Sequence, residues 1–324
     1  VYKRQVSALL DAPEYTPARI ELQGQGNLEA LDITTFSARL LDGSLQGSAR
    51  LAWAPQLTAS LTLTGKQLNP ALRWEDWPGT LALRLQANLE ASGDAWLLRF
   101  DDASIDGRLR QQPVRLATRG SYRQGPLTIN KGELASGPSR LQLQGQLGER
   151  IDLHWELDSP DLATLLPAAA GRLSGKGRLQ GTPQAPWLTA QLAGHDLHYQ
   201  TDHVDSVQLD ADIDAAGKQR SRLKLALAGG KLADTPVDRF TLIGSGFPQA
   251  HTLILSTAGA GSTADIAIDG SWQPDSWSYT LTHAELVPDG LAAWQLQQTL
   301  TGRISATHAT LPQACWTSAA SRLC

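Results

Sequence analysis

Apolar and polar residues alternate along most of this 324-residue chain. The alternation is clean over residues 81–89, 141–147, 207–213 and 223–227, where apolar residues, mainly leucine, recur at every second position. A period of two places successive side chains on opposite faces of a strand. One apolar and one polar face is typical of antiparallel sheet, whereas parallel strands covered by helices are apolar on both faces. The pattern therefore predicts an all-β protein built on an antiparallel sheet.

The alternation is interrupted in a similar way near residues 61–79, 153–171 and 279–302. Each time a strand runs into a proline and a short turn or helix, and glycine then precedes new alternation. Asn69 and Ser159 directly precede a proline and are predicted to cap short helices, and a third short helix is predicted over residues 291–296. Repetition on this scale predicts an elongated array of strand modules. No change in composition marks a boundary, so residues 1–324 are predicted to form one continuous segment.

The strands are unusual because leucine outnumbers valine and isoleucine together. β-Branched residues normally lead in strands and would suit the core of a closed sandwich. A sheet curled into a groove needs no second sheet, and its leucine-rich inner face can stay open. The candidates for that lining are Leu61, Leu63, Leu81, Leu83, Leu85, Leu141, Leu143, Leu223, Leu225 and Leu227. Which parity of each strand faces inward is left open.

Charge and cysteine content narrow the class of protein. A net charge of −4 gives no reason to expect a nucleic-acid partner, and no apolar run reaches the roughly 20 residues that span a bilayer. The spacing of Cys315 and Cys324 fits neither a C-x-x-C redox motif nor a usual zinc site. We favour a disulfide, which would stabilise by roughly 2–3 kcal/mol and indicate an oxidising compartment; the alternative is two free thiols.

One segment resembles a known repeat. Residues 171–186 read G-R-L-S-G-K-G-R-L-Q-G-T-P-Q-A-P and lead into another alternating strand. This is similar to the repeat of the TamB family (translocation and assembly module subunit), within the wider AsmA-like group. Cys315 and Cys324 likewise resemble a cysteine pair within chains of that family. The resemblance covers most of the chain, is strongest over residues 137–324 and is weaker before residue 50.

The resemblance implies a β-taco, an antiparallel sheet folded lengthwise into an apolar groove. It implies a non-enzymatic protein of the periplasm, anchored to the inner membrane of Gram-negative bacteria, without a cofactor. It further implies a role in outer-membrane biogenesis with the outer-membrane barrel TamA, through parts of the family's chains that are expected to lie outside this one. Phospholipid would be the ligand of the groove.

Two functions therefore remain open. In the first, the apolar face conducts lipid acyl chains between membranes. In the second, the protein is a periplasmic chaperone or scaffold that receives strands of autotransporters or outer-membrane proteins by β-augmentation. Phospholipid bound after gentle purification would favour the first, and bound peptide the second.

Two polar clusters are candidates for a metal site. His195 and His198 lie close in sequence, but residues three apart in a regular strand face opposite sides. Asp210, Asp212 and Asp214 share one face, as is ordinary on a solvated strand. No metal site is therefore expected.

Catalysis has little support in the sequence. No nucleophile elbow, zinc-protease or phosphate-loop motif occurs. Ser174 and Lys176 are the nearest catalytic pair, and they lie in a glycine-rich stretch expected to be a turn. The ten tryptophans do not cluster with basic residues, and Trp155, Trp187 and Trp272 are expected to line the core or the groove.

Overall fold

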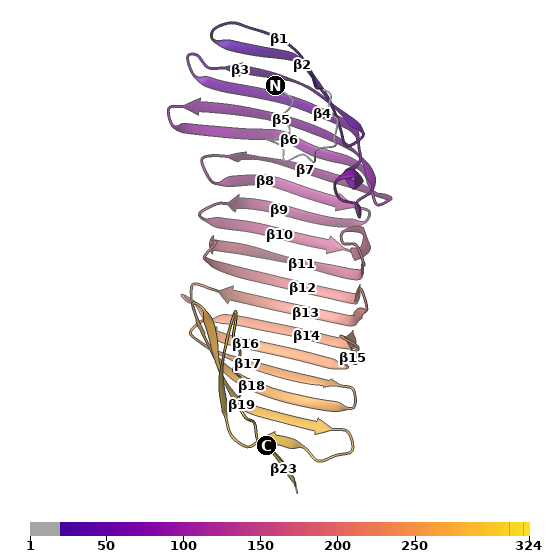
Figure 1. The fold of residues 1–324 in the computed structure, drawn as a ribbon, viewed down its shortest axis with the longest axis vertical. Coiled ribbons are helices and arrows are strands. Elements are labelled where there is room, and N and C mark those ends of the chain that lie inside the picture. Colours follow the sequence, from indigo (N-terminus) through magenta and orange to yellow (C-terminus); the bar gives the residue numbers. More distant parts are fainter. Residues whose placement is uncertain (1–19, 311, 320) are drawn as a thin grey trace. The chain divides into compact units, whose positions relative to one another are not determined.

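The structure is a computed structural model and describes residues 20–310, 312–319 and 321–324. In these residues it contains 23 strands, two 3-10 helices and no α-helix, and the strands belong to one open antiparallel sheet (Figure 1). The predicted fold class is therefore confirmed. Internal contacts divide the chain into two compact units, Val1–Gly137 with Gln142–Gly145, and Pro138–Leu141 with Gln146–Cys324. We call them unit 1 and unit 2; one continuous segment over residues 1–324 stays a prediction.

Unit 1 is a meander in which each strand pairs antiparallel with the next along the chain. Its strands are β1 (Ile20–Gly26), β2 (Ala30–Leu40), β3 (Gly43–Ala52), β4 (Leu57–Leu68), β5 (Gly79–Ser92), β6 (Ala95–Leu109), β7 (Gln112–Tyr122) and β8 (Leu127–Ser136). The following strand, β9 (Ser139–Leu147), has residues assigned to both units.

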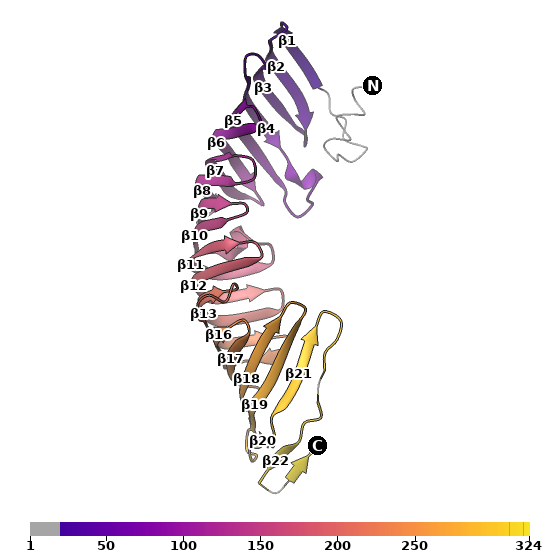
Figure 2. The ribbon, with the colours of Figure 1, turned by 90° about the vertical axis from the view of Figure 1, so that its left-hand side faces the viewer.

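Unit 2 continues the same meander pattern from β10 to β19, as Figure 2 shows for β17, β18 and β19. Its long strands are β10 (Ile151–Ser159), β11 (Ala169–Thr182), β12 (Ala185–Tyr199), β13 (Asp202–Asp214), β14 (Ser221–Leu232), β16 (Arg239–Phe247), β17 (Ala250–Gly259), β18 (Ser262–Gln273) and β19 (Ser276–Pro288). The two-residue β15 (Thr235–Pro236) pairs with β14.

The meander of unit 2 changes after β19. Both β20 (Trp294–Leu296) and β21 (Leu300–Ser305) pair with β19, at opposite ends of it. Strand β22 (Trp316–Ser318) then pairs with β20, and β23 (Ser321–Leu323) pairs with β22. A disulfide joins Cys315 to Cys324 across this last short hairpin.

Two of the three expected short helices are present, each as a single 3-10 turn. η1 (Pro70–Leu72) is capped by Asn69, whose Oδ1 accepts from the backbone N–H of Ala71 at 3.2 Å. η2 (Leu162–Thr164) is capped in the same way by Asp161. The helix expected over residues 291–296 is wrong, because residues 294–296 form β20 against β19. A longer-range strand pairing outweighs the weak local helix signal there.

Ser159 does not cap η2 as predicted; it ends β10 with its side chain buried. Its hydroxyl lies 2.8 Å from that of Ser139, which also accepts from the hydroxyl of Thr164 at 2.8 Å. The Ser139 hydroxyl donates to the carbonyl of Asp161, and the single hydroxyl proton of Thr164 is shared between that carbonyl and the Ser139 hydroxyl. This hydroxyl cluster fixes the η2 loop to the sheet within unit 2, and it satisfies polar groups that would be costly to bury alone.

The sheet is not covered by a second layer of the described chain. The solvent-accessible area is 21238 Å², against about 13,000 Å² expected for a compact monomer of this mass. Few hydrophobic residues of the described chain are buried, namely Leu68, Ala169, Ala190, Ala211, Ala284 and Leu300. The apolar side chains of the strands are mostly half-buried instead, as in β5, where they alternate with exposed residues that are polar except for Ala82.

Candidate functional site

The strand register of unit 2 aligns apolar residues with apolar residues from β10 to β21. Residues directly opposite one another in adjacent antiparallel strands share a face of the sheet. One such row consists of Trp155, Gly177, Ala190, Ala211, Leu223, Gly244, Leu253, Ile268, Leu281 and Leu300. A second consists of Leu157, Gly175, Leu192, Leu209, Leu225, Leu242, Leu255, Ile266 and Ala284. We call the surface formed by these rows the apolar face of unit 2.

Unit 1 shows the same arrangement by itself. One of its rows consists of Leu22, Phe36, Gly47, Leu63, Leu85, Ala103, Thr118 and Gly132. Another consists of Ile20, Ala38, Leu45, Gly65, Leu83, Ile105, Leu116 and Leu134. Neither row contains a charged residue, so each unit has an apolar face of its own.

Eight of the leucines proposed from the sequence can be placed by the strand register, and all eight lie on these apolar faces. Leu223, Leu225 and Leu227 lie on the apolar face of unit 2. In unit 1, Leu61, Leu63, Leu81, Leu83 and Leu85 lie on its apolar face. Leu141 and Leu143 occupy half-buried positions of β9, and the Cβ of Leu143 would lie 3.5 Å from a Cβ added to Gly132. Contact of these leucines with a lipid stays a prediction.

Sequence reasoning missed the small residues of the apolar faces. Glycines lie directly opposite aromatic residues in five strand pairs: Phe36 with Gly47, Phe100 with Gly120, Trp155 with Gly177, and Tyr279 with both Gly270 and Gly302. A Cβ added to Gly177 would lie 2.6 Å from the Trp155 ring. The aromatic ring therefore covers the glycine of the neighbouring strand. The signal was present in residues 171–181, where every second position is glycine or leucine, but it can be read only once the register is known.

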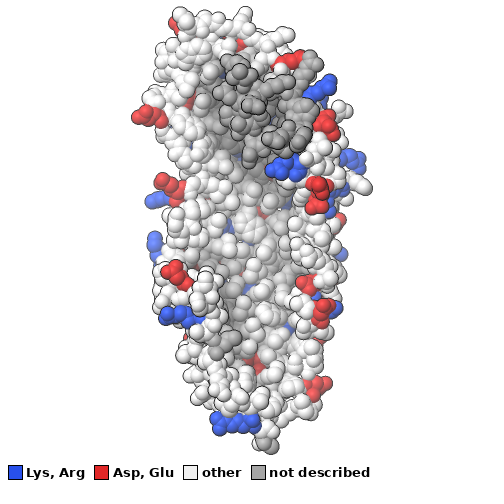
Figure 3. All heavy atoms as spheres, viewed as in Figure 1, with Lys and Arg blue, Asp and Glu red and all other residues white. Residues whose placement is uncertain are grey.

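Charged side chains lie to the sides of the apolar face. Figure 3 shows one face of the molecule, on which Lys, Arg, Asp and Glu gather along the two margins. In the part occupied by unit 2, the strip between the margins is hollowed and largely free of charged side chains. The hairpin turns lie at these margins, so the charged side chains seen on this face gather toward the ends of the strands, and the apolar rows cross their middles.

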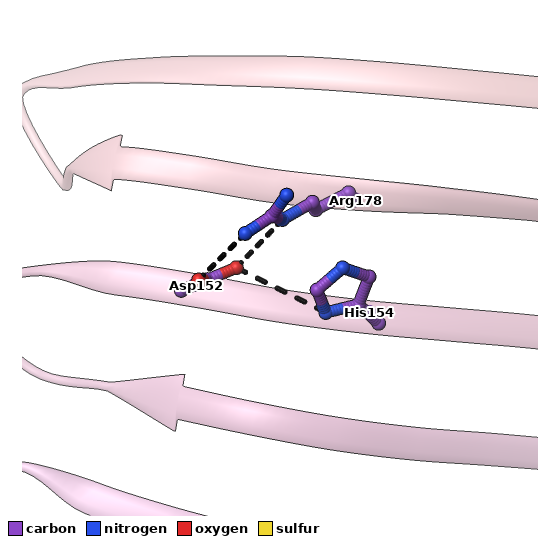
Figure 4. Close-up of polar contacts among 3 residues, drawn as sticks. All are labelled: Asp152, His154 and Arg178. Atoms are coloured by element: carbon purple, nitrogen blue, oxygen red, sulfur yellow. Dashed lines mark hydrogen bonds and ion pairs between the residues drawn. The ribbon is translucent and has the colours of Figure 1, made fainter.

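The opposite face of unit 2, which we call the polar face, carries the side-chain bonds between strands. Asp152 of β10 receives two hydrogen bonds of 2.8 Å from the guanidinium of Arg178 in β11 (Figure 4). His154 Nδ1 lies 3.9 Å from the same carboxylate. The hydrogen bonds from Arg178 hold the pKa of Asp152 below its usual range, and they raise that of Arg178. In unit 1, the ammonium of Lys131 lowers the pKa of Glu133 in the same way.

Two of the three aspartates of β13 that share this face, Asp212 and Asp214, have separate structural partners. Asp212 accepts from the indole N–H of Trp187 at 2.7 Å and lies 3.4 Å from Arg222. Asp214 is buried and accepts from the backbone N–H groups of residues 216, 218 and 219. It thereby fixes the turn before β14. Trp187, expected in the core or groove, thus lies on the polar face, whereas Trp155 lies on the apolar face.

The expectation that His195 and His198 face opposite sides of β12 is wrong. The alternation is interrupted at Asp196, whose φ is 51° and where the register against β11 shifts. Gly194 and Leu197 are also three residues apart, yet a Cβ on Gly194 would lie 2.8 Å from the Leu197 side chain, so they share a face. The ring of His198 stacks on that of His203 in β13, with the ring centroids 5.6 Å apart. In the part of the chain that the structure describes, no three His, Cys, Asp or Glu residues are grouped as a metal site would require.

Ser174 and Lys176 lie within β11 and not in a turn. Ser174 is opposite Asp158 and Lys176 opposite Glu156, both on the polar face. The expected turn is absent because the glycines of this strand, such as Gly175 and Gly177, lie on the apolar face and allow close packing there.

The chain matches one family model, described as TamB, N-terminal domain, over residues 1–324. The protein belongs to the TamB family. Members of this family take part in outer-membrane assembly and lipid transport and are non-enzymatic components of that process. They are periplasm-spanning envelope proteins associated with TamA and with lipids. Within residues 20–310, 312–319 and 321–324, neither helix has the length and hydrophobicity needed to span a membrane.

Proposed function

We propose that this TamB-family chain is a segment of a periplasmic, inner-membrane-anchored conduit that carries phospholipid during outer-membrane biogenesis. The observation that supports it is the uncharged, half-buried apolar face that each unit presents. Large exposed apolar surfaces on soluble proteins mark sites of interaction with a partner or ligand. Here the surface is built from aliphatic side chains across successive strands, which suits a flexible acyl chain.

The energetics favour binding without strong trapping. Each CH₂ group transferred from water to an apolar surface gains about 0.8 kcal/mol. The leucine and isoleucine side chains of one row are followed by similar ones in the next strand, so the gain changes little along the face. A charged side chain on that face would interrupt it, because burying an unpaired charge is costly.

Site-specific photocrosslinking in the full-length protein tests the proposal. A photoreactive amino acid replaces Leu225, on the apolar face, or Lys224, the next residue on the polar face. Cells are irradiated, and the protein is purified and analysed by mass spectrometry for phospholipid adducts. We expect adducts at position 225 and at least about tenfold fewer at position 224, a difference that corresponds to about 1.4 kcal/mol.

The same experiment distinguishes the proposed lipid conduit from the chaperone alternative. A chaperone or scaffold acting by β-augmentation would give peptide adducts of outer-membrane proteins. Peptide adducts at position 225 without lipid adducts would overturn the proposal, as would equal lipid labelling at positions 224 and 225.

A further inference from the structure

A cavity of about 780 Å³ opens on the polar face of unit 2, at the end of the strands where β16 turns into β17 and β18 into β19. Its volume is in the range typical of small-molecule sites, roughly 300–1,000 Å³. Its floor is the backbone of one row of the sheet, formed by Gly246, His251, Gly270, Tyr279 and Gly302. Leu253 and Trp277, which lie next to this row on the apolar face, do not line the cavity, so it belongs to the polar side.

The walls of the cavity are two rows of mostly short side chains, one on each side of the floor. Successive residues of a strand face opposite sides of the sheet, so both rows point away from the apolar face. The first row consists of Ser245, Thr252, Asp269, Thr280 and Thr301. The second contains Phe247, Ala250, Ser271, Ser278 and Arg303. The cavity is therefore a groove that runs across the strands, and we call it the polar groove.

Two arginines lie at opposite ends of the polar groove. Arg220 directly precedes β14 and donates to the Ser245 hydroxyl at 3.4 Å, and Arg303 lies on β21. Among the described residues neither guanidinium lies within ion-pair distance of a carboxylate. Asp269 is the one acidic residue among the described lining residues, and it accepts from the Thr252 hydroxyl at 2.8 Å. The charges of the groove therefore favour a negatively charged ligand.

The separation of the two arginines favours a long ligand. Five strand-to-strand steps lead from β14 through β16, β17, β18 and β19 to β21. At about 4.8 Å for each step, the two outer strands are about 24 Å apart. A ligand that contacts both guanidinium groups must therefore be extended and carry separated negative charges.

The surface between the arginines suits sugar hydroxyls better than a peptide. Extended peptides are bound through their backbone at an open sheet edge, whereas the backbone groups of this floor are already paired with neighbouring strands. Recognition must use side chains, and the hydroxyls of the first row both donate and accept hydrogen bonds. Phe247, which is 41% exposed, adds an aromatic surface on which a sugar ring can pack.

We propose that the polar groove binds an extended anionic glycan, a polysaccharide chain whose sugars carry carboxylates. Carboxylates of the glycan pair with Arg220 and Arg303, and its hydroxyls bond to the row from Ser245 to Thr301. The glycan lies on the face opposite to the apolar rows, so the inference does not depend on a lipid there. In a periplasm-spanning protein, such a site ties the chain to the glycan layer of the envelope.

Glycan strands released from peptidoglycan by an amidase test the proposal, because the cleavage leaves free carboxylates along the strand. Their binding to the detergent-purified full-length protein is measured by isothermal titration calorimetry. Chitin oligosaccharides of matched length are the neutral probe, since they have the same sugar backbone without carboxylates. We expect the carboxylated strands to bind at least about tenfold more tightly, as charge-assisted hydrogen bonds require. Equal binding of the two probes, or no binding of the carboxylated strands, would overturn the proposal.

The double variant Arg220→Gln/Arg303→Gln provides the second measurement. Arg239→Gln is the matched control, because Arg239 lies on the same face at the other end of β16. The affinity for the carboxylated strands is expected to fall at least about fivefold in the double variant and to stay unchanged in the control. Unchanged affinity in the double variant, or an equal loss in the control, would overturn the site. Lipid adducts at position 225 are expected to persist in both variants.

Polyglutamate distinguishes a glycan from an acidic peptide. It carries carboxylates but no hydroxyls, so it is expected to bind more weakly than the glycan strands and to compete with them poorly. Polyglutamate that binds as tightly as the glycan strands would overturn the assignment to a glycan.

Discussion

The two faces of unit 2 are held together in different ways. On the polar face, side chains bond from strand to strand, as Arg178 does to Asp152, Trp187 to Asp212 and Ser256 to Asp265. The central rows of the apolar face contain no charged side chain and pack by shape, with leucines beside glycine and alanine. Away from the ends of the strands, the directional side-chain bonds of unit 2 therefore lie on the polar face. The apolar face can then receive a ligand without losing any of those bonds.

The largest effect is expected from placing a charge on the apolar face, which removes the difference between the two faces. Leu225→Glu is expected to reduce phospholipid labelling of the apolar face at least tenfold and to weaken outer-membrane integrity, because a carboxylate holds water where an acyl chain must lie. Sensitivity to large antibiotics and detergent, together with lipid adducts at Leu255, measures the effect in cells that make the full-length protein.

Lys224→Glu is the matched control, since it adds the same side chain one residue away on the polar face. Equal losses from both variants would contradict the assignment of faces. The urea midpoints of both proteins show that each is folded.

Shape packing on the apolar face is tested at Gly177. A Cβ there would lie 2.4 Å from the carbonyl of Thr189 and 2.6 Å from the Trp155 ring. Gly177→Ala is therefore expected to lower the free energy of unfolding by about 1–3 kcal/mol, because the strand or the ring must shift. Urea unfolding followed by tryptophan fluorescence measures the loss.

Gly132→Ala in β8 is the comparison, because a Cβ there meets nothing closer than 3.3 Å. Neither glycine has a positive φ, so backbone strain does not separate them. An equal loss at the two positions would show that contact with Trp155 is not the cause.

The bonds of the polar face are tested at Trp187. Trp187→Phe removes the donor to Asp212 and keeps most of the ring, so a loss of about 1–2 kcal/mol in the free energy of unfolding is expected. Lipid adducts at position 225 are expected to stay unchanged, because that residue is on the other face. A loss of adducts with normal stability would mean that the two faces are not independent.

The smallest effect is expected at the Asp152–Arg178 pair, whose side chains are 48% and 39% exposed. The folded protein lowers the pKa of Asp152, so the pair stabilises above the unfolded pKa of about 4 and this contribution is lost as pH falls through the lowered folded value. Asp152→Asn should lower the urea midpoint slightly at neutral pH. The difference from the unmodified protein should vanish in acid; a difference that grows in acid would contradict the pairing.

Much of the sheet could be predicted from the sequence because alternation is a local signal. Residues 81–89 and 223–227 are strands with their leucines on one face, as the two-residue period requires. The short turn capped by Asn69 was also recognisable, since a capping side chain acts within two residues. The turn of η2 was expected too, but with Ser159 in place of Asp161 as its cap. The parity facing inward in each strand could not be read, because it depends on pairing with neighbours.

The remaining differences arise from interactions between distant residues. Asp196 interrupts the alternation through its backbone conformation, which no sequence period shows. Residues 294–296 become strand by pairing with β19, and Ser159 is drawn into a hydroxyl cluster with Ser139, twenty residues earlier. A hydrogen bond from the indole N–H of Trp277 joins it to His251, twenty-six residues earlier. Each needs the register before it can be recognised.

The constant register of the apolar rows sets how such a chain can change in length. A single residue inserted within β13 would turn every later side chain of that strand to the other face. Removal of a whole hairpin has no such effect: without β16 and β17, β14 would meet β18 still antiparallel, with Leu225 facing Ile266. Insertions and deletions that preserve the surface therefore come in units of two strands, so related chains can differ in reach while keeping the same cross-section.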